Sequence, residues 1–90
     1  SLLINTFRTA LEYMFSLPKI GRVIGEADNK NHKLDALTRL VGYKLQEVIV
    51  MPDKMANLTI CTRESYCDKF PELKAQLLSQ QFHTVETLLA

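Results

Sequence analysis

The stretch from Arg22 to Tyr43 constrains the fold most strongly, because its hydrophobic pattern changes twice within a few residues. The apolar run from Arg22 to Gly25 is typical of a strand, and the acidic, amide-rich segment 26–31 is typical of a turn. An amphipathic segment follows and ends at Gly42, a residue suited to the left-handed position after a helix. Strand, polar turn and helix predict the first part of a βαβ unit. In such units ligands bind at the turn after the strand, where the next helix offers unpaired N–H groups.

The remaining segments add one helix before this stretch and two strands and a helical region after it. We expect strands near 22–26, 43–50 and 55–62 and helices at 2–16 and 32–41 that cover the sheet. The expected apolar stripes are Leu3, Phe7, Ala10, Leu11 and Met14 in the first helix, and Leu34, Leu37, Leu40 and Val41 in the second.

The segment 55–62 alternates regularly between two faces. Ala56, Leu58 and Ile60 share one face, and Asn57, Thr59 and Cys61 share the other. One face should belong to the core and the other should be wetter or line a site. We expect Leu58 and Ile60 to point away from solvent.

The C-terminal part, from Arg63 to Ala90, is expected to be helical. Pro71 with Glu72 beside it is a plausible helix start. Two apolar stripes follow, namely Leu73, Leu77 and Leu78, and then Phe82, Val85, Leu88 and Leu89.

Bulk properties exclude several classes of protein. The chain of 90 residues has a formal net charge of +1, which argues against a nucleic-acid module, because those usually carry a basic face. No apolar run approaches the roughly eighteen residues of a membrane span. We expect a cytoplasmic protein, and the start at Ser1 without a methionine indicates a piece of a longer one.

The cysteines and histidines do not predict a metal site. The spacing between Cys61 and Cys67 matches no known zinc motif, and both are expected to be ordinary reduced thiols. His32 and His83 have no companions at ligand spacing. Both are expected to face solvent, although His32, in the first helical turn, could face a bound cofactor instead.

Three motifs in a fixed order resemble a known family. They are Gly-Glu-Ala-Asp-Asn-Lys-Asn at 25–31, Met-Pro-Asp-Lys-Met-Ala-Asn-Leu at 51–58, and Thr-Arg-Glu-Ser-Tyr at 62–66. Together with Asn31 and the pair Gly42-Tyr43, they resemble the aerobactin-type siderophore acetyltransferases of the GNAT superfamily of N-acyltransferases. The resemblance covers roughly residues 4 to 70. It implies a sheet whose last strand sits between the other two and antiparallel to both.

The resemblance assigns roles to the turn. Asn31 would hydrogen-bond the pantetheine or phosphate arm of acetyl-coenzyme A or another acyl-coenzyme A, although an asparagine here could simply cap the helix. Asp28 would assist acyl transfer together with a histidine upstream, and the alternative is an ordinary surface aspartate. Because Ala27 replaces the family's proline, the rigidity of the turn is open.

Other residues receive weaker assignments from the same resemblance. Lys33 and Arg39 would steer the 3′-phosphate of the cofactor, or would be solvated helix charges. Glu26 and Lys54 are candidate substrate contacts, and Glu26 could instead be a buried structural acid. Lys54 and Arg63 could also be ion-pair partners of Glu26 and Glu64.

Thr38 departs from a common GNAT pattern. Many of these enzymes have a tyrosine here that protonates the leaving thiolate, which threonine cannot do.

The resulting hypothesis is an α+β chain that forms the C-terminal half of a GNAT fold. It has a half-domain at 1–66 with three strands covered by helices, and a helical extension at 67–90. The parent enzyme would move an acyl group from coenzyme A to an N-hydroxylated amine of the hydroxylysine or hydroxyornithine type, and this truncated form would be inactive.

The alternative is a small non-catalytic interaction module that keeps the half-fold. For the half-domain we expect a homodimer, made by pairing of the free edge at 22–26 or by exchange of terminal helices. A folded monomer would favour the interaction module.

Overall fold

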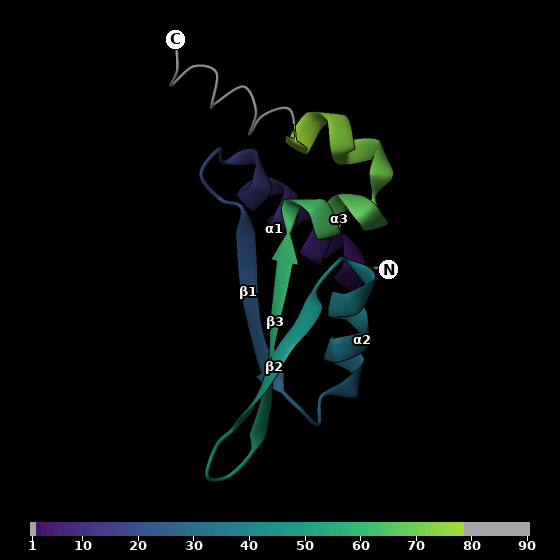
Figure 1. Ribbon diagram of the computed structural model, residues 1–90. Coiled ribbons are helices and arrows are strands. Elements are labelled where there is room, and N and C mark those ends of the chain that lie inside the picture. The colour runs from purple at the N-terminus through teal and green to yellow at the C-terminus, as the bar shows by residue number, and fades with distance from the viewer. Residues whose placement is uncertain (1, 79–90) are drawn as a thin grey trace.

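The computed structural model describes residues 2–78, and their elements alternate between helices and strands (Figure 1). In chain order they are α1 (Leu2–Ser16), β1 (Arg22–Asp28), α2 (His32–Leu40), β2 (Lys44–Val50), β3 (Met55–Thr62), α3 (Arg63–Lys69) and the 3-10 helix η1 (Pro71–Leu73). A further helical segment covers residues 74–78. The expected positions of the strands and of the first two helices are therefore confirmed to within two residues. Among these residues no helix is long and apolar enough to cross a membrane.

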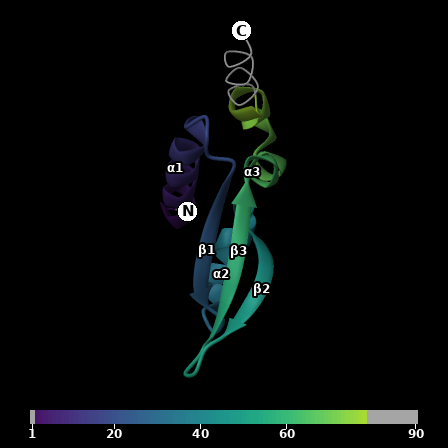
Figure 2. The same cartoon turned by 60° about the vertical axis from the view of Figure 1, so that its left-hand side comes forward.

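The three strands form one sheet in the order β1-β3-β2, with β3 antiparallel to both neighbours. β1 and β2 are therefore parallel to each other, and α2 connects them, which completes the expected βαβ unit with a third strand inserted between its two strands. This is an α+β architecture, and it confirms the predicted place of the last strand. Figure 2 shows α2 behind the strands and α1 beside β1.

The helices cover the face of β3 that we expected to be the wetter one. Asn57, Thr59 and Cys61 are buried, whereas Leu58 and Ile60 are only half-buried and lie on the opposite face. The expectation that Leu58 and Ile60 belong to the core was wrong. Alternation identifies two faces but does not say which of them the helices will cover. Here the bulk of the core comes from the helices and from Tyr43, so the strand contributes small residues.

Two residues of the predicted stripe of α1 were misplaced. Leu3 is 50% exposed and Ala10 is exposed, while Ile4 packs against the core and Phe15 is fully buried within it. Leu3 and Ala10 lie at the border between the core-facing side and the solvent side of the helix. At this border the 3.6-residue repeat does not decide whether a residue is buried.

α2 begins and ends as its sequence predicts. The Oδ1 atom of Asn31 accepts a hydrogen bond from the Leu34 N–H at 3.1 Å, and Gly42 follows the helix with φ of +107°. A side chain at Gly42 would meet the backbone oxygen of Ser65 at 2.8 Å, so both conformation and space require glycine. Leu40 is 57% exposed and does not join the apolar side that we expected.

The core lies at the end of the sheet where α1, α3 and the C-terminal described residues meet. Its buried residues are Leu11, Phe15, Val41, Tyr43, Cys61, Tyr66, Cys67 and Leu77. Leu73 and Leu78 pack against this cluster, so the first apolar stripe after residue 70 is confirmed. The second stripe, Phe82, Val85, Leu88 and Leu89, lies outside the described residues, as does His83.

The Arg63 side chain links the segment just after α1 to the last residues of the described chain. It is fully buried and donates to three backbone oxygens: Nε to Ile20 at 2.8 Å, Nη1 to Leu77 at 3.0 Å and Nη2 to Leu17 at 2.6 Å. Burial lowers the pKa of the guanidinium, which is opposed by the neighbouring Glu64. Within residues 2–78 Arg63 makes no ion pair. The expectation of an Arg63–Glu64 pair was wrong, because carbonyl groups satisfy the buried cation instead.

Candidate functional site

The turn between β1 and α2 is held by hydrogen bonds rather than by proline. The Lys30 N–H donates to Oδ1 of Asp28 at 2.9 Å, and the Asn31 N–H donates to the Asp28 carbonyl oxygen at 2.9 Å. The Asn31 carbonyl in turn accepts from the Asp35 N–H at 3.1 Å. The Asp28 side chain thus forms an Asx-type turn, which fixes the backbone despite Ala27.

A second set of contacts ties this turn to the β2–β3 hairpin. The Asn29 side chain donates from Nδ2 to Oδ1 of Asn57 at 2.9 Å, and its N–H donates to the Met55 carbonyl at 2.8 Å. Beside these contacts lies a hollow of about 280 Å³ lined by Asn29, Lys30, Met51, Lys54 and Met55. The structure therefore places Lys54 in the same hollow as Lys30, next to the predicted turn.

Four of the predicted site residues lie close together in the chain around this turn. Asp28, Asn31 and Lys33 are exposed at the carboxyl end of β1 and in the first turn of α2. Glu26 precedes them on the same face of the sheet as Asp28, opposite α2, and is exposed, so its alternative role as a buried structural acid was wrong.

Arg39 lies apart from this group. It belongs to the last turn of α2, about 12 Å along the helix from Asn31 at 1.5 Å per residue. Its Nε atom donates to Oδ2 of Asp35 at 3.0 Å. The structure does not bring Arg39 to the turn, so its side chain is a helix charge with a local partner.

Neither Glu26 nor Lys54 takes part in an ion pair within residues 2–78, where the pairs are Arg8 with Glu12 and Glu72, and Arg39 with Asp35. The expectation that these two residues could pair with each other was wrong. Their side chains remain available to a ligand.

Thr38 and His32 both belong to α2. The Thr38 hydroxyl donates to the Asp35 carbonyl at 3.0 Å, an ordinary local bond of a helical threonine. His32 is exposed. The described residues contain no group of three or more histidine, cysteine, aspartate or glutamate residues that could hold a metal ion.

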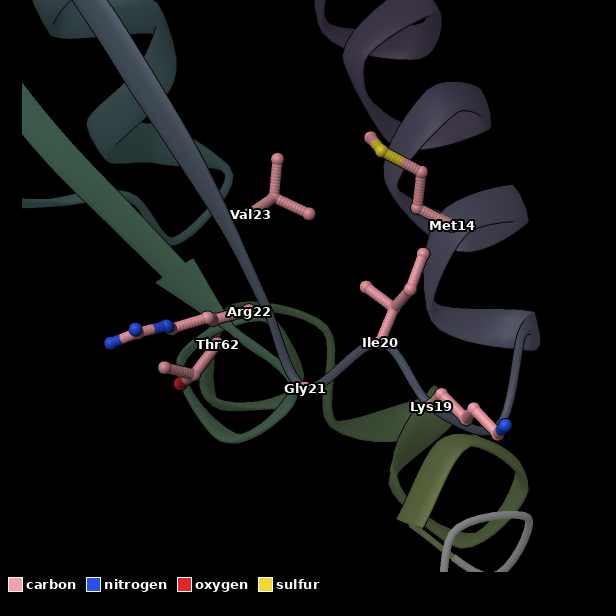
Figure 3. A pocket seen from close by; sticks show the side chains of 7 residues that line it. All are labelled: Met14, Lys19, Ile20, Gly21, Arg22, Val23 and Thr62. Carbon is pink, nitrogen blue, oxygen red and sulfur yellow. The ribbon is translucent and has the colours of Figure 1, made fainter.

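A larger hollow of about 630 Å³ lies between α1 and the amino end of β1. Figure 3 shows Met14, Ile20 and Val23 in the gap between the helix and the strand, whereas Lys19 and Arg22 point away on opposite sides. This hollow adjoins the edge of β1, which no other strand of the described chain covers. No sequence pattern predicted this hollow, because it depends on the distance between α1 and the sheet.

The two cysteines are buried, and both are unpaired. Burial raises the pKa of Cys61 to about 11, and the neighbouring Cys67 adds to this, while a hydrogen bond with Ser65 acts in the opposite direction. Burial also raises the pKa of Cys67. A thiol held in its neutral form is a poor nucleophile, so these cysteines are structural.

Comparison with known proteins supports the fold. No family model matches the sequence, and no curated protein matches it. Among solved structures, an uncharacterized protein from Bacillus halodurans is similar, with a TM-score of 0.72 and 18% sequence identity. The match covers 86% of this chain and 40% of that chain. The likeness at this identity establishes a shared α+β fold, and the present chain spans less than half of the matched structure.

Proposed function

We propose that this chain forms the C-terminal half of a GNAT-type N-acyltransferase of the aerobactin-type siderophore family. Its substrates would be an acyl-coenzyme A and an N-hydroxylated amine of the hydroxylysine or hydroxyornithine type. The observation that carries the proposal is the turn after β1. There the motif residues Asp28 and Asn31 lie at the carboxyl end of the strand, and α2 begins beside them.

The geometry of Asn31 is compatible with both of its suggested roles. Its Oδ1 atom caps α2, and within residues 2–78 its Nδ2 group has no hydrogen-bond acceptor. The amide can therefore keep the helix capped while it donates to a carbonyl or phosphate oxygen of the cofactor. Lys33, two residues further on in the first turn of α2, would add positive charge for the phosphates.

Asp28 offers a free carboxylate oxygen at the same turn. Oδ1 accepts from the Lys30 N–H, which leaves Oδ2 to accept a hydrogen bond from the N–H of a hydroxylamine. The nitrogen would attack the thioester carbonyl, a C–N bond would form, the C–S bond would break, and the proton lost from nitrogen would end on the thiolate. Lys54 and Lys30, which line the adjacent hollow, would attract the carboxylate of an amino-acid substrate.

Two further features support the proposal that the chain is half of a larger domain. The outer edge of β1 is unpaired among the described residues, and an apolar hollow lies beneath it, where a further strand could add. The matched structure continues well beyond the part that this chain covers.

The test is an assay of the parent enzyme with acetyl-coenzyme A and hydroxylysine or hydroxyornithine, in which thiol release and hydroxamate formation are both measured. Asn31→Ser keeps an oxygen that can cap the helix but removes the amide donor. We expect it to raise KM for the donor roughly five-fold, the effect of losing about 1 kcal/mol from one neutral hydrogen bond. Asp28→Asn should lower kcat while KM for the donor stays within about two-fold.

The control is Lys69→Gln, an exposed position on α3 away from the turn. The 90-residue chain alone should show no turnover. Hydroxamate formation that does not depend on acyl-coenzyme A, or its absence with every acceptor tried, would contradict the proposal.

A non-catalytic interaction module is the second candidate. It is favoured by one observation, the uncovered face of the sheet, on which Ile24 is 57% exposed.

A further inference from the structure

One face of the sheet has no helix on it. This open face consists of the even-numbered residues of β1 and β3 together with Lys44, Glu47 and Ile49 of β2, as the strand pairing shows. α1 and α3 contribute to the core on the other face, where Cys61 and Tyr43 are buried, and α2 lies on that side of the sheet as well. The open face is visible toward the viewer in Figure 2, with α2 behind it.

A β-bulge in β2 places opposite charges on this face. The register shifts between Leu45 and Glu47, so Lys44 pairs with Ile60 and Glu47 pairs with Leu58. In a regular strand, positions three apart point to opposite faces, and the extra residue brings Lys44 and Glu47 to the same one. The bulge therefore creates a strand whose open side carries a cation and an anion in neighbouring rows.

The other edge strand repeats the same polarity. Arg22 pairs with Thr62 at one end of β1, and Asp28 pairs with Ala56 at the other. Cations thus gather at the Thr62 end of the open face and anions at the Ala56 end, where Glu26 pairs with Leu58 and adds to the charge of Asp28. Ile24, Leu58 and Ile60 form an apolar centre between the cations and the anions, and Glu26 lies at its edge.

A face with this arrangement is complementary to itself after a half-turn. We infer that the open face binds the open face of a second copy of this chain, through a two-fold axis that lies midway between the two sheets, is parallel to them and runs across the strands. Lys44 of each copy then lies opposite Glu47 of the other, and Arg22 lies opposite Asp28. Leu58 of each copy packs on Ile60 of the other in the centre. Two sheets packed in this way form a sandwich about 10 Å thick.

The inference concerns a different surface from the strand edge or the terminal helices that the sequence suggested for dimerisation, and it shares one residue, Asp28, with the proposed function. It explains why half-buried Leu58 and Ile60 occupy the centre of a face whose two edge strands carry charges. A purely solvated face needs no apolar centre between two rows of opposite charge.

Light scattering at micromolar concentration tests this inference, with variants in which the charge at Lys44 or at Glu47 is reversed. The wild-type chain should have twice its monomer mass of 10.3 kDa. Lys44→Glu places two glutamates opposite each other, and Glu47→Lys does the same with two lysines. Each variant alone should weaken dimerisation by roughly tenfold or more, because attraction becomes repulsion at two symmetric positions.

The mixture of the two variants is the decisive measurement. Each interface pair in the mixed dimer again joins Lys to Glu, so an equimolar mixture should recover the dimer that neither variant forms alone. Lys69→Glu, on α3, is the matched control and should dimerise like the wild type.

Circular dichroism should show an unchanged fold for each variant, since Lys44 and Glu47 are exposed. A monomeric wild type, a mixture that stays monomeric, or single variants that dimerise as well as the wild type would each overturn the inference. The last result would point to pairing through the edge of β1.

Discussion

The Tyr66 hydroxyl donates a 2.6 Å hydrogen bond to Oε2 of Glu12, a residue 54 positions earlier in the chain. The Arg8 guanidinium lies beside both, with Nε at 3.4 Å from each of the two oxygens, and its carbon is 4.0 Å from the centre of the Phe70 ring. Tyr66 is fully buried, and burial together with the hydrogen bond to Glu12 raises the pKa of its hydroxyl well above the ordinary value. This contact joins α1 to α3 across the core.

Tyr66→Phe removes the hydroxyl and leaves the ring in place. Glu12 keeps Arg8 as a partner, so we expect the free energy of unfolding to fall by about 1 kcal/mol, the net value of one hydrogen bond. Urea denaturation measures it. Tyr13→Phe is the control, because Tyr13 is 68% exposed, and it should leave the free energy unchanged within about 0.5 kcal/mol. Equal effects of the two substitutions would contradict the role assigned to the buried hydroxyl.

Arg63→Met should lower the free energy of unfolding much more than Tyr66→Phe does. The substitution keeps an unbranched side chain but leaves the carbonyls of Leu17, Ile20 and Leu77 without their donor. We expect a loss of about 3 kcal/mol or more in the free energy of unfolding, because unsatisfied buried acceptors each carry a desolvation penalty. Arg63→Lys should recover only part of it, since an ammonium cannot reproduce the planar fork of donors. Full recovery with lysine would show that charge alone matters at this position.

Gly42 and Gly21 provide a matched pair of glycine substitutions. Gly42→Ala places a methyl group 2.8 Å from the Ser65 carbonyl oxygen at a positive φ, whereas Gly21 has nothing within 4 Å of the same position. We expect Gly42→Ala to destabilise the chain by more than 1 kcal/mol. Gly21→Ala should be neutral within about 0.5 kcal/mol. The midpoint of thermal unfolding, compared with that of the wild type, measures the effect of each substitution. Similar midpoints for the two variants would contradict the close approach of α3 to residue 42.

The buried thiol of Cys61 predicts a loss of stability at high pH. Its pKa is about 11 in the folded chain against an ordinary value of 9.0, so the unfolded chain loses the proton first as pH rises. The stabilising effect is complete below pH 9 and disappears as pH rises through 11. Urea denaturation under reducing conditions should show a decline over this range that becomes shallower in Cys61→Ala. An identical decline in that variant would assign it to other groups.

The sequence determined the order of elements and the ends of α2 well, and the reasons are local. Asn31 and Gly42 act within a few residues of where they stand, as a cap and as a helix terminator, so their roles could be predicted without the rest of the fold. The place of β3 between β1 and β2 followed from resemblance to a family, since periodicity alone does not order strands.

What the sequence could not determine depends on distant contacts. The covered face of β3 was assigned wrongly because Leu58 and Ile60 are more apolar than Asn57 and Thr59, yet Asn57 is satisfied by Asn29 across the sheet. Arg63 could not be recognised as a buried donor to three carbonyls, because its acceptors come from two other segments of the chain. Arg39 was grouped with Asn31 by charge, although the length of α2 separates them.

The central position of β3 has a consequence for how the chain acquires its structure during synthesis. β1 and β2 emerge first, yet neither pairs with the other, so no ladder of the sheet can form until residues 55–62 are available. α1 and α2 can form locally before that point, whereas the strands must wait with their edges unpaired. Arg63, the next residue after β3, then brings Leu17 and Ile20 to the completed sheet. These three strands therefore pair in one cooperative step, once β3 is available.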